Sequence, residues 1–288
     1  MYQYYKYHAL GNDYIVMNPA ETPLRLTPER IRRICDRHFG IGSDGILFGP
    51  LVEKGGPDFR IYNPDGGEAE KSGNGIRIFS RYLIDKGFER GERFRLKTLG
   101  GPVEVERLDP KGGTLRVGMG TVTFRSRGIP VAGPDREVVG EPMTFGDRRW
   151  QATCVSIGNP HCVIPVPSVS PALVRSLGPI VERAPQFPNR INLQILEAAD
   201  RGNIKIEIWE RGAGYTLASG TSSCAAACAA RRLGLTDARV AVHMPGGTIQ
   251  VEIGGDWSVR MTGSVGSVCE GVLSEDLIGE LKAMPESV

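Results

Sequence analysis

The chain has 288 residues, of which 40% are hydrophobic and 24% charged, and it carries 38 glycines and 20 prolines. This balance is typical of a globular protein rich in turns, and the length predicts about two domains. The formal net charge is only +2, from 35 basic and 33 acidic residues. It gives no indication of a nucleic-acid partner or of an anionic membrane surface.

The start of the chain is aromatic and polar and lacks the apolar stretch of a signal peptide. No apolar run reaches the roughly 18 residues that a membrane span needs. The six cysteines are scattered and do not resemble a disulfide framework. We therefore expect a soluble, cytoplasmic protein with no membrane partner.

The first half of the chain begins with an apolar and aromatic segment that ends at Gly11-Asn12-Asp13. Sixty residues after Asn12, Ser72-Gly73-Asn74-Gly75 opens a stretch with helical spacing of apolar residues, which stops at Gly87. Two strands joined by a turn are predicted next, over Gly100–Val105 and Thr114–Gly118.

The same series returns in the second half. An alternating segment leads to Gly158-Asn159-Pro160, and sixty residues after Asn159 a second helical stretch opens at Ser219-Gly220-Thr221-Ser222. It stops at Gly234, and two strands follow over 246–251 and 257–260. Equal spacings in the same order predict two homologous α+β halves.

We place these halves at 1–121 and 122–271, with a short closing helix in 272–288 that packs on the first half. Each half is expected to be a curved, mostly antiparallel sheet around one central helix. The segment Arg125–Arg149, rich in Gly, Pro and charge, is typical of a linker or of edge strands. Two pseudo-symmetric halves would present equivalent loops to one ligand between them.

The two Ser-Gly turns allow two interpretations. Helix N-termini present unpaired N–H groups and the positive end of the helix dipole, so a glycine-rich turn there favours an anion. Ser72 and Ser219 are also good N-caps with no further role. Their equivalent places in a duplication favour a ligand site. Neither turn is a phosphate-binding loop of a known kind. Lys71-Ser72 resembles the end of a Walker A motif, but Glu70 stands where that motif requires glycine.

Seven motifs between about residues 4 and 271 carry a family resemblance: Leu10-Gly11-Asn12-Asp13, Gly40-Ile41-Gly42-Ser43-Asp44-Gly45, Asn63-Pro64-Asp65-Gly66, Gly73-Asn74-Gly75-Ile76-Arg77, Gly158-Asn159-Pro160-His161-Cys162, Phe187-Pro188-Asn189-Arg190-Ile191-Asn192 and Glu210-Arg211-Gly212. Together they resemble the motifs of the diaminopimelate epimerases, cofactor-independent amino-acid epimerases of lysine and peptidoglycan precursor synthesis.

The resemblance implies that two cysteines, one at each turn, act as base and acid on opposite faces of the substrate Cα. It implies that the α-carboxylate is bound by Gly73, Asn74, Gly220 and Thr221. It implies that the amino groups and the distal end are bound by Asn12, Asn63, Asn159, Asn192, Glu210 and Arg211. His161 and Glu210 would lie next to the acid–base positions. The implied protein needs no cofactor or metal, takes a small amino-acid substrate and is a homodimer.

The sequence departs from this pattern at the decisive positions, because Ser72 and Ser219 stand where the family has cysteine. A thiol has a pKa near 8.5, whereas an alcohol lies close to the 15.7 of water. A gap of about 7 pKa units corresponds to about 9–10 kcal/mol in the cost of forming the anion. Proton transfer through two serines should therefore be severely slowed.

Three explanations remain open for the serines. Both cysteines were exchanged by engineering; or the chain is a divergent isomerase or dehydratase that uses His161 or Glu210 as its base; or it binds an amino acid without turning it over. The remaining candidates are weaker. The spacing of Cys154, His161 and Cys162 fits no usual zinc pattern, and Cys224 and Cys228 are expected in a helix core.

Overall fold

The computed structural model describes residues 2–53 and 56–286. They form two compact units, the first built from Met1–Val117 and Ser264–Val288 and the second from Gly118–Gly263. Residues 264–271, which we expected in the second half, belong to the first unit. The reason is that β18 (Gly266–Val272) pairs antiparallel with β1 (Gln3–Ala9), so that the chain returns to its starting point.

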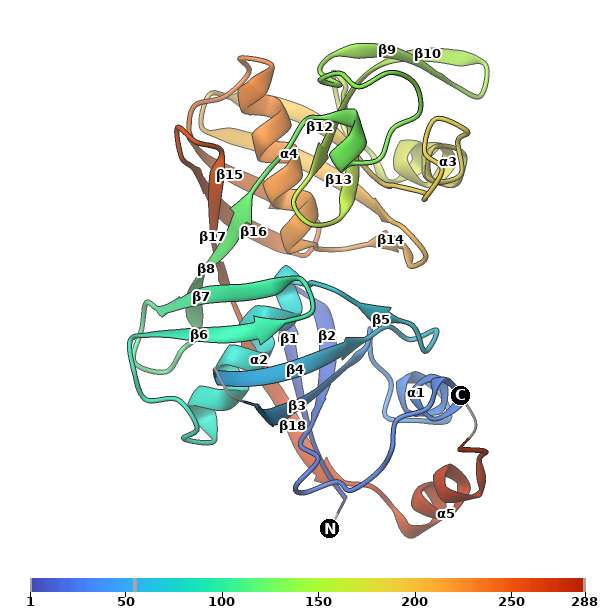
Figure 1. Cartoon of the computed structure of the whole chain (residues 1–288), viewed down its shortest axis with the longest axis vertical. Helices are drawn as coiled ribbons and strands as arrows, with labels where there is room; N and C mark the ends of the chain where they lie inside the picture. Colours follow the sequence, from blue (N-terminus) through green and yellow to red (C-terminus); the bar gives the residue numbers. More distant parts are fainter. Residues whose placement is uncertain (1, 54–55, 287–288) are drawn as a thin grey trace. The chain divides into compact units, whose positions relative to one another are not determined.

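The sheet of the first unit (Figure 1) is hydrogen bonded in the order β18, β1, β2 (Asn12–Met17), β3 (Ile46–Glu53), β4 (Gly56–Tyr62), β6 (Arg93–Thr98), β7 (Gly101–Arg107) and β8 (Thr114–Thr121). Residues 118–121 at the end of β8, which we expected in the first half, already belong to the second unit. The short β5 (Glu68–Ala69) pairs with β4. Neighbours are antiparallel except in the pairs β2–β3 and β4–β6, which are parallel.

The central helix of the first unit, α2 (Gly73–Asp85), begins at Ser72, whose side chain caps it. Its apolar residues are buried against β1 and β2. The helix ends where Gly87 takes a φ of +75°, a conformation that glycine adopts without strain. The predicted start and stop of this helix are confirmed.

Two further helices complete the first unit. Helix α1 (Pro28–Cys35) is capped by Thr27, and α5 (Glu275–Ala283) is the predicted closing helix. The buried guanidinium of Arg30 joins them, because its Nε donates to Leu281 O at 2.7 Å and Nη1 donates to Arg25 O at 2.8 Å. Ile31, Ile34 and Leu281 share the core beneath.

The sheet of the second unit has the order β9 (Glu141–Phe145), β10 (Arg148–Ser156), β11 (Pro160–Pro165), β12 (Asn192–Asp200), β13 (Asn203–Glu210), β15 (Arg239–Met244), β16 (Gly247–Ile253) and β17 (Ser258–Ser264). Here β14 (Gly214–Thr216) pairs with β13. The parallel pairs are β11–β12 and β13–β15.

Helix α4 (Gly220–Arg232) is the central helix of the second unit. It is capped by Ser219, and every residue from Gly220 to Ala230 is buried among strands of that unit. Small side chains make this possible, since a helix that is buried all round must fit closely between its neighbours. Cys224 and Cys228 are fully buried there, as expected of core residues.

The duplication is therefore confirmed strand by strand. Helix α1 lies between β2 and β3 in the chain, and α3 (Pro171–Glu182) lies between β11 and β12. The parallel pairs occur at equivalent places, and β18 pairs with β1 as β9 pairs with β10. Residues 125–149 are part of the second unit, because they supply β9 and the buried core residues Val138 and Phe145.

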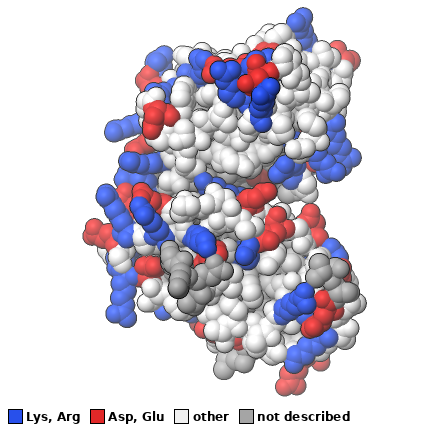
Figure 2. All heavy atoms as spheres, in the orientation of Figure 1, with Lys and Arg blue, Asp and Glu red and all other residues white. Residues whose placement is uncertain are grey.

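The surface agrees with the composition. On the face seen in Figure 2, basic and acidic side chains are interspersed over both units, as the near-zero net charge suggests. In the part of the chain that the structure describes, no helix has both the length and the hydropathy to cross a membrane.

Candidate functional site

The first Ser-Gly turn is the N-terminus of α2. Ser72 Oγ accepts a hydrogen bond from Gly75 N at 3.0 Å, so Ser72 is an N-cap, the second of its two interpretations, which requires only an acceptor oxygen. The hydroxyl hydrogen is still available for donation, since capping uses the oxygen as acceptor. The N-terminus of an α-helix carries the positive end of the helix dipole, so Gly73 and Asn74 lie where an anion is favoured.

Two predicted ligand-binding amides meet beside this turn. Asn74 Nδ2 donates to Asn12 Oδ1 at 2.9 Å, although 62 positions separate them. Arg77 Nη2 donates to Asn74 Oδ1 at 2.8 Å, and Arg77 is fully buried. The turn between β1 and β2 thus lies against the start of α2.

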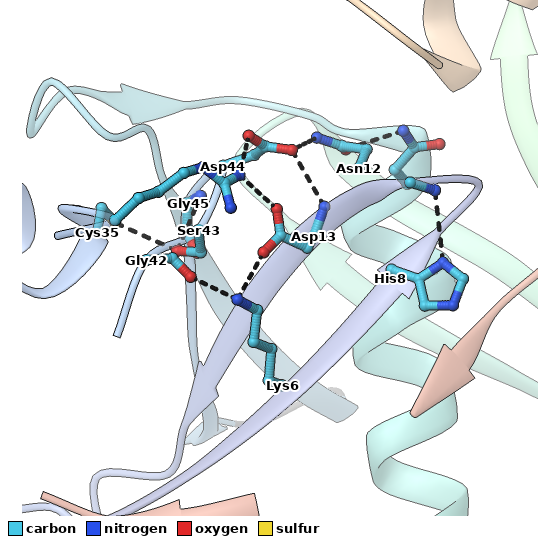
Figure 3. Close-up of polar contacts among 12 residues, drawn as sticks. Lys6, His8, Asn12, Asp13, Cys35, Gly42, Ser43, Asp44 and Gly45 are labelled. Carbon is cyan, nitrogen blue, oxygen red and sulfur yellow. Dashed lines mark hydrogen bonds and ion pairs between the residues drawn. The ribbon is translucent and has the colours of Figure 1, made fainter. Parts of the chain in front are cut away.

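Asp44 is a residue of this site that the sequence analysis did not single out. Its Oδ2 accepts from Asn12 Nδ2 at 2.9 Å and from Asp13 N at 3.1 Å, and Oδ1 accepts from Arg37 Nη2 at 2.9 Å (Figure 3). The parallel pairing of β2 with β3, in which Ile15 faces Ile46, brings Asp13 and Asp44 side by side. Only this pairing could have revealed the contact.

Asp13 stands behind Asp44 in the same network. It forms ion pairs with Lys6 Nζ at 2.9 Å and with Arg37 Nη2 at 2.7 Å. Burial acts to raise the pKa of the Asp13 carboxyl, but hydrogen bonds from Arg37 and Lys6 outweigh it and lower that pKa.

Asn63 lies in the turn between β4 and β5, where its backbone N–H donates to Gly67 O at 2.8 Å.

The second Ser-Gly turn has the same geometry at the N-terminus of α4. Ser219 Oγ accepts from Ser222 N at 3.3 Å and lies 3.4 Å from Thr221 Oγ1. Thr221 Oγ1 also accepts from Asn159 Nδ2 at 3.4 Å. The structure therefore brings Ser219, Thr221 and Asn159 together, three of the residues that the family resemblance implies for the site.

His161 joins this group through amide side chains. Its Nε2 lies 2.9 Å from Asn159 Oδ1, and its Nδ1 lies 3.2 Å from Gln194 Oε1. Complete burial lowers the pKa of the imidazole to about 3. The ring is neutral at pH 7 and a weak proton acceptor, so its geometry favours holding Asn159 in place over serving as a base.

Gln194 is the second residue that sequence reasoning missed. It is fully buried, and its Nε2 donates to Ser222 Oγ at 3.0 Å. Because Ser222 in turn donates its N–H to Ser219, the polar side chains close a ring around the start of α4. Gln194 lies inside an apolar-looking strand, and a buried amide in such a strand needs polar partners.

Asn192 and Arg211 form a second cluster in this unit. Asn192 Oδ1 accepts from Arg211 N at 2.8 Å, and Asn192 Nδ2 donates to Pro160 O at 2.7 Å. Asn192 therefore fixes the turn that follows β13, whose last residue is Glu210. The buried carboxylate of Glu182 holds the same turn, because it accepts from Gly212 N at 3.2 Å.

Two of the cysteines considered as metal ligands lie on neighbouring strands. Cys154 and Cys162 face each other on β10 and β11 and are fully buried. A hydrogen bond with Cys162, together with burial, raises the pKa of Cys154, which keeps it a thiol. Within residues 2–53 and 56–286, no three His, Cys, Asp or Glu side chains come together as metal ligands.

Each unit thus offers the same chemistry. A helix N-terminus begins at a serine hydroxyl, and amide side chains held by buried hydrogen bonds lie beside it. Such an arrangement suits a carboxylate and a neighbouring proton-transfer position.

Comparison with known proteins agrees with this arrangement. A family model described as diaminopimelate epimerase matches residues 4–125 and 153–268. The chain is 52% identical to diaminopimelate epimerase 2 of a Nostoc species over 96% of both chains. It is 41% identical to the diaminopimelate epimerase of Moorella thermoacetica, over 92% of this chain and 97% of that one.

A solved structure shares the fold. It is a probable proline racemase from Agrobacterium radiobacter with bound carbonate, which superposes with a TM-score of 0.70 at 15% identity and covers 96% of this chain and 94% of that chain. At this identity the likeness concerns the fold alone.

Proposed function

This chain belongs to the diaminopimelate epimerase family of PLP-independent isomerases, and we propose that its own substrate is diaminopimelate, inverted at one Cα. On this proposal it acts in the cytoplasm, in lysine synthesis, as a homodimer. The observation that carries the proposal is the repeated N-cap serine with its adjoining amides, one set in each unit.

In each unit, carboxylate binding is assigned to the N-terminus of the central helix, where the helix dipole favours negative charge. The residues assigned to it are Gly73 and Asn74 in α2, and Gly220 and Thr221 in α4. Asn12, Asn63 and Asn159 would take the amino groups. The turn at Glu210 and Arg211, fixed by Asn192, would take the distal carboxylate and ammonium.

Ser72 and Ser219 are assigned the two proton-transfer positions. In a two-sided proton transfer, one serine must first lose its hydroxyl proton to solvent, and the alkoxide then takes the Cα proton. The other serine gives its hydroxyl proton to the opposite face of Cα and is left as the alkoxide, so each serine bears the cost of the anion in turn. The N–H that it already accepts, from Gly75 or Ser222, would stabilise that charge by a few kcal/mol at most.

The second candidate is a protein that binds diaminopimelate with little turnover. The specific observation in its favour is the alcohol at both positions, with a cost of about 9–10 kcal/mol relative to thiols. The two candidates share the same binding residues and differ only in the rate at Cα.

Proton exchange separates them. LL-diaminopimelate in D2O is followed by proton NMR with the wild-type chain and with Ser72→Cys, Ser219→Cys and the double variant. Loss of the α-proton signal with the wild-type chain supports the epimerase. The second candidate, a binding protein with little turnover, is supported if the wild-type chain and the double variant both bind diaminopimelate tightly but exchange is at least about a thousandfold faster in the double variant. No binding and no exchange by either chain would contradict diaminopimelate as the ligand.

A further inference from the structure

The amides of Asn12 and Asn74 belong to one linear chain of hydrogen bonds, which begins and ends at charged groups. Arg77 Nη2 donates to Asn74 Oδ1 at 2.8 Å, Asn74 Nδ2 donates to Asn12 Oδ1 at 2.9 Å, and Asn12 Nδ2 donates to Asp44 Oδ2 at 2.9 Å. Asn12, Asn74 and Arg77 are at most 9% exposed, so water cannot readily replace these partners.

The two ends differ in kind. An arginine guanidinium carries only donors, and an ionised carboxylate carries only acceptors. An amide between them can be satisfied in one orientation only, because reversing it would set NH2 against the guanidinium or oxygen against the carboxylate. The charged ends therefore decide which way both amides point.

From this geometry we propose that Asp44 is a positioning residue for ligand binding, which orients Asn12 and, through it, Asn74. Arg77 would fix the other end of the same chain. The inference rests on the proposed function, in which these two amides lie against the substrate. Each amide NH2 has a second hydrogen, whose direction is set once the first is committed to the chain.

The surroundings of Asp44 hold its carboxylate in the required position (Figure 3). Its Oδ2 also accepts from Asp13 N at 3.1 Å, and its Oδ1 accepts from Arg37 Nη2 at 2.9 Å. Every neighbour named here donates to Asp44. A carboxylate fits this position because it accepts on both oxygens, whereas an amide can accept on only one.

This asymmetry gives a sharp test with Asp44→Asn. If the new amide turns its oxygen to Asn12, its NH2 faces the Arg37 guanidinium; if it turns the other way, its NH2 faces the Asn12 NH2 and the Asp13 N–H. One arrangement becomes acceptable when Arg37→Met is added, because the Arg37 side chain is 55% exposed and its removal lets the NH2 face water. We therefore expect Arg37→Met to rescue Asp44→Asn.

The first readout needs no ligand. In the full-length chain labelled with ¹⁵N, the side-chain NH2 signals of Asn12 and Asn74 are assigned and their solvent exchange is measured. Asp44→Asn should shift both pairs and speed exchange about tenfold, the effect of one lost hydrogen bond. Arg37→Met alone should leave them in place, and the double variant should restore them.

The second readout is the Kd for LL-diaminopimelate by calorimetric titration. We expect a rise of about tenfold for Asp44→Asn and a return to within about threefold of wild type in the double variant. If Asp44 only stabilised the fold, the double variant would bind diaminopimelate more weakly than Asp44→Asn does, because it loses a further ion pair. Unchanged amide signals in Asp44→Asn, or no rescue, would overturn the inference.

Failure of the proposed function has a different signature. If no chain binds diaminopimelate, that function is wrong, while the amide signals still decide whether Asp44 orients Asn12 and Asn74. If all chains bind equally although the amides have moved, the positioning role is wrong and the function stands.

Discussion

Ser72 and Ser219 each use the hydroxyl oxygen to accept from a helix N–H. The hydroxyl hydrogen of Ser72 is left to be donated, whereas the hydroxyl of Ser219 also lies 3.4 Å from Thr221 Oγ1, where either oxygen can be the donor. A substitution at Ser72 can therefore separate stability from binding, because the cap needs an acceptor, whereas the proposed ligand would bring a carboxylate to the same helix end.

We predict that Ser72→Ala lowers the free energy of unfolding by about 1 kcal/mol, the usual value of an N-cap. Ser72→Asp should keep stability within about 0.5 kcal/mol of wild type, because its carboxylate also caps the helix and suits the dipole. The same carboxylate should repel the ligand and abolish its binding. Urea denaturation and calorimetry would measure both effects, and binding by Ser72→Asp as tight as wild type would contradict an anion site at α2.

His161 gives a prediction on pH. Its pKa is about 3 in the folded chain because of burial, against about 6.5 when unfolded. Between these values the unfolded state binds the extra proton, so stability falls as pH falls below 6.5. We expect a loss of about 2 kcal/mol between pH 7 and pH 5 from this residue alone.

Urea denaturation at the two pH values, with His161→Gln as the control, would measure the loss. The control should be less stable at pH 7 but should lack most of the pH-dependent difference. An equal difference in both chains would show that the imidazole is not held neutral.

At the scale of elements, helix α3 supports the turn that carries Glu210 and Arg211. Gly178 packs directly on the Trp209 ring, so that a Cβ added at this glycine would lie 2.3 Å from Trp209 Cγ. The indole Nε1 donates to Glu182 Oε2 at 2.7 Å, and Glu182 also holds Gly212. The end of β13 is thus fixed from α3.

Gly178→Ala should therefore lower the free energy of unfolding by about 1–3 kcal/mol through overpacking and should also weaken ligand binding. Gly279→Ala is the matched control, because α5 has open space at that glycine. There the same change should stabilise the helix by up to about 1 kcal/mol and leave binding alone. Normal binding by Gly178→Ala would show that α3 does not position Arg211.

Elements also show why the sequence predicted some of the fold and not the rest. The helices at Ser72 and Ser219 were predictable because caps, apolar spacing and terminal glycines are local signals. Helix α3 contains Gly178 and Pro179, which normally interrupt a helix, and it forms because its apolar side is buried. The roles of Asp44 and Gln194 depend on strand pairings that no local pattern records.

At the scale of the whole molecule, the first unit is assembled from both ends of the chain. Helix α5 covers Ile31 and Ile34 and supplies carbonyls to Arg30. A chain that ends at Leu273 should expose this core, and we expect amide exchange in α1 to accelerate at least about a hundredfold. Hydrogen exchange read by mass spectrometry would show it.

The second unit provides the internal reference for that experiment, since it is built from one continuous stretch. Exchange in α4 should change by less than about threefold. Leu281→Ala should give an intermediate acceleration in α1, because it leaves a cavity without removing the helix. Equal acceleration in α1 and α4 would mean that the two units unfold together.

The pairing of β18 with β1 also determines when the sheet of the first unit can be completed during translation. β1 is made long before its partner β18, because residues 10–265, which include the whole second unit, lie between them. At about 5–20 residues per second, this delay is roughly 13–50 s. During that time the second unit can complete its core while the first presents an unpaired strand edge, so a nascent chain would need shielding at its oldest end.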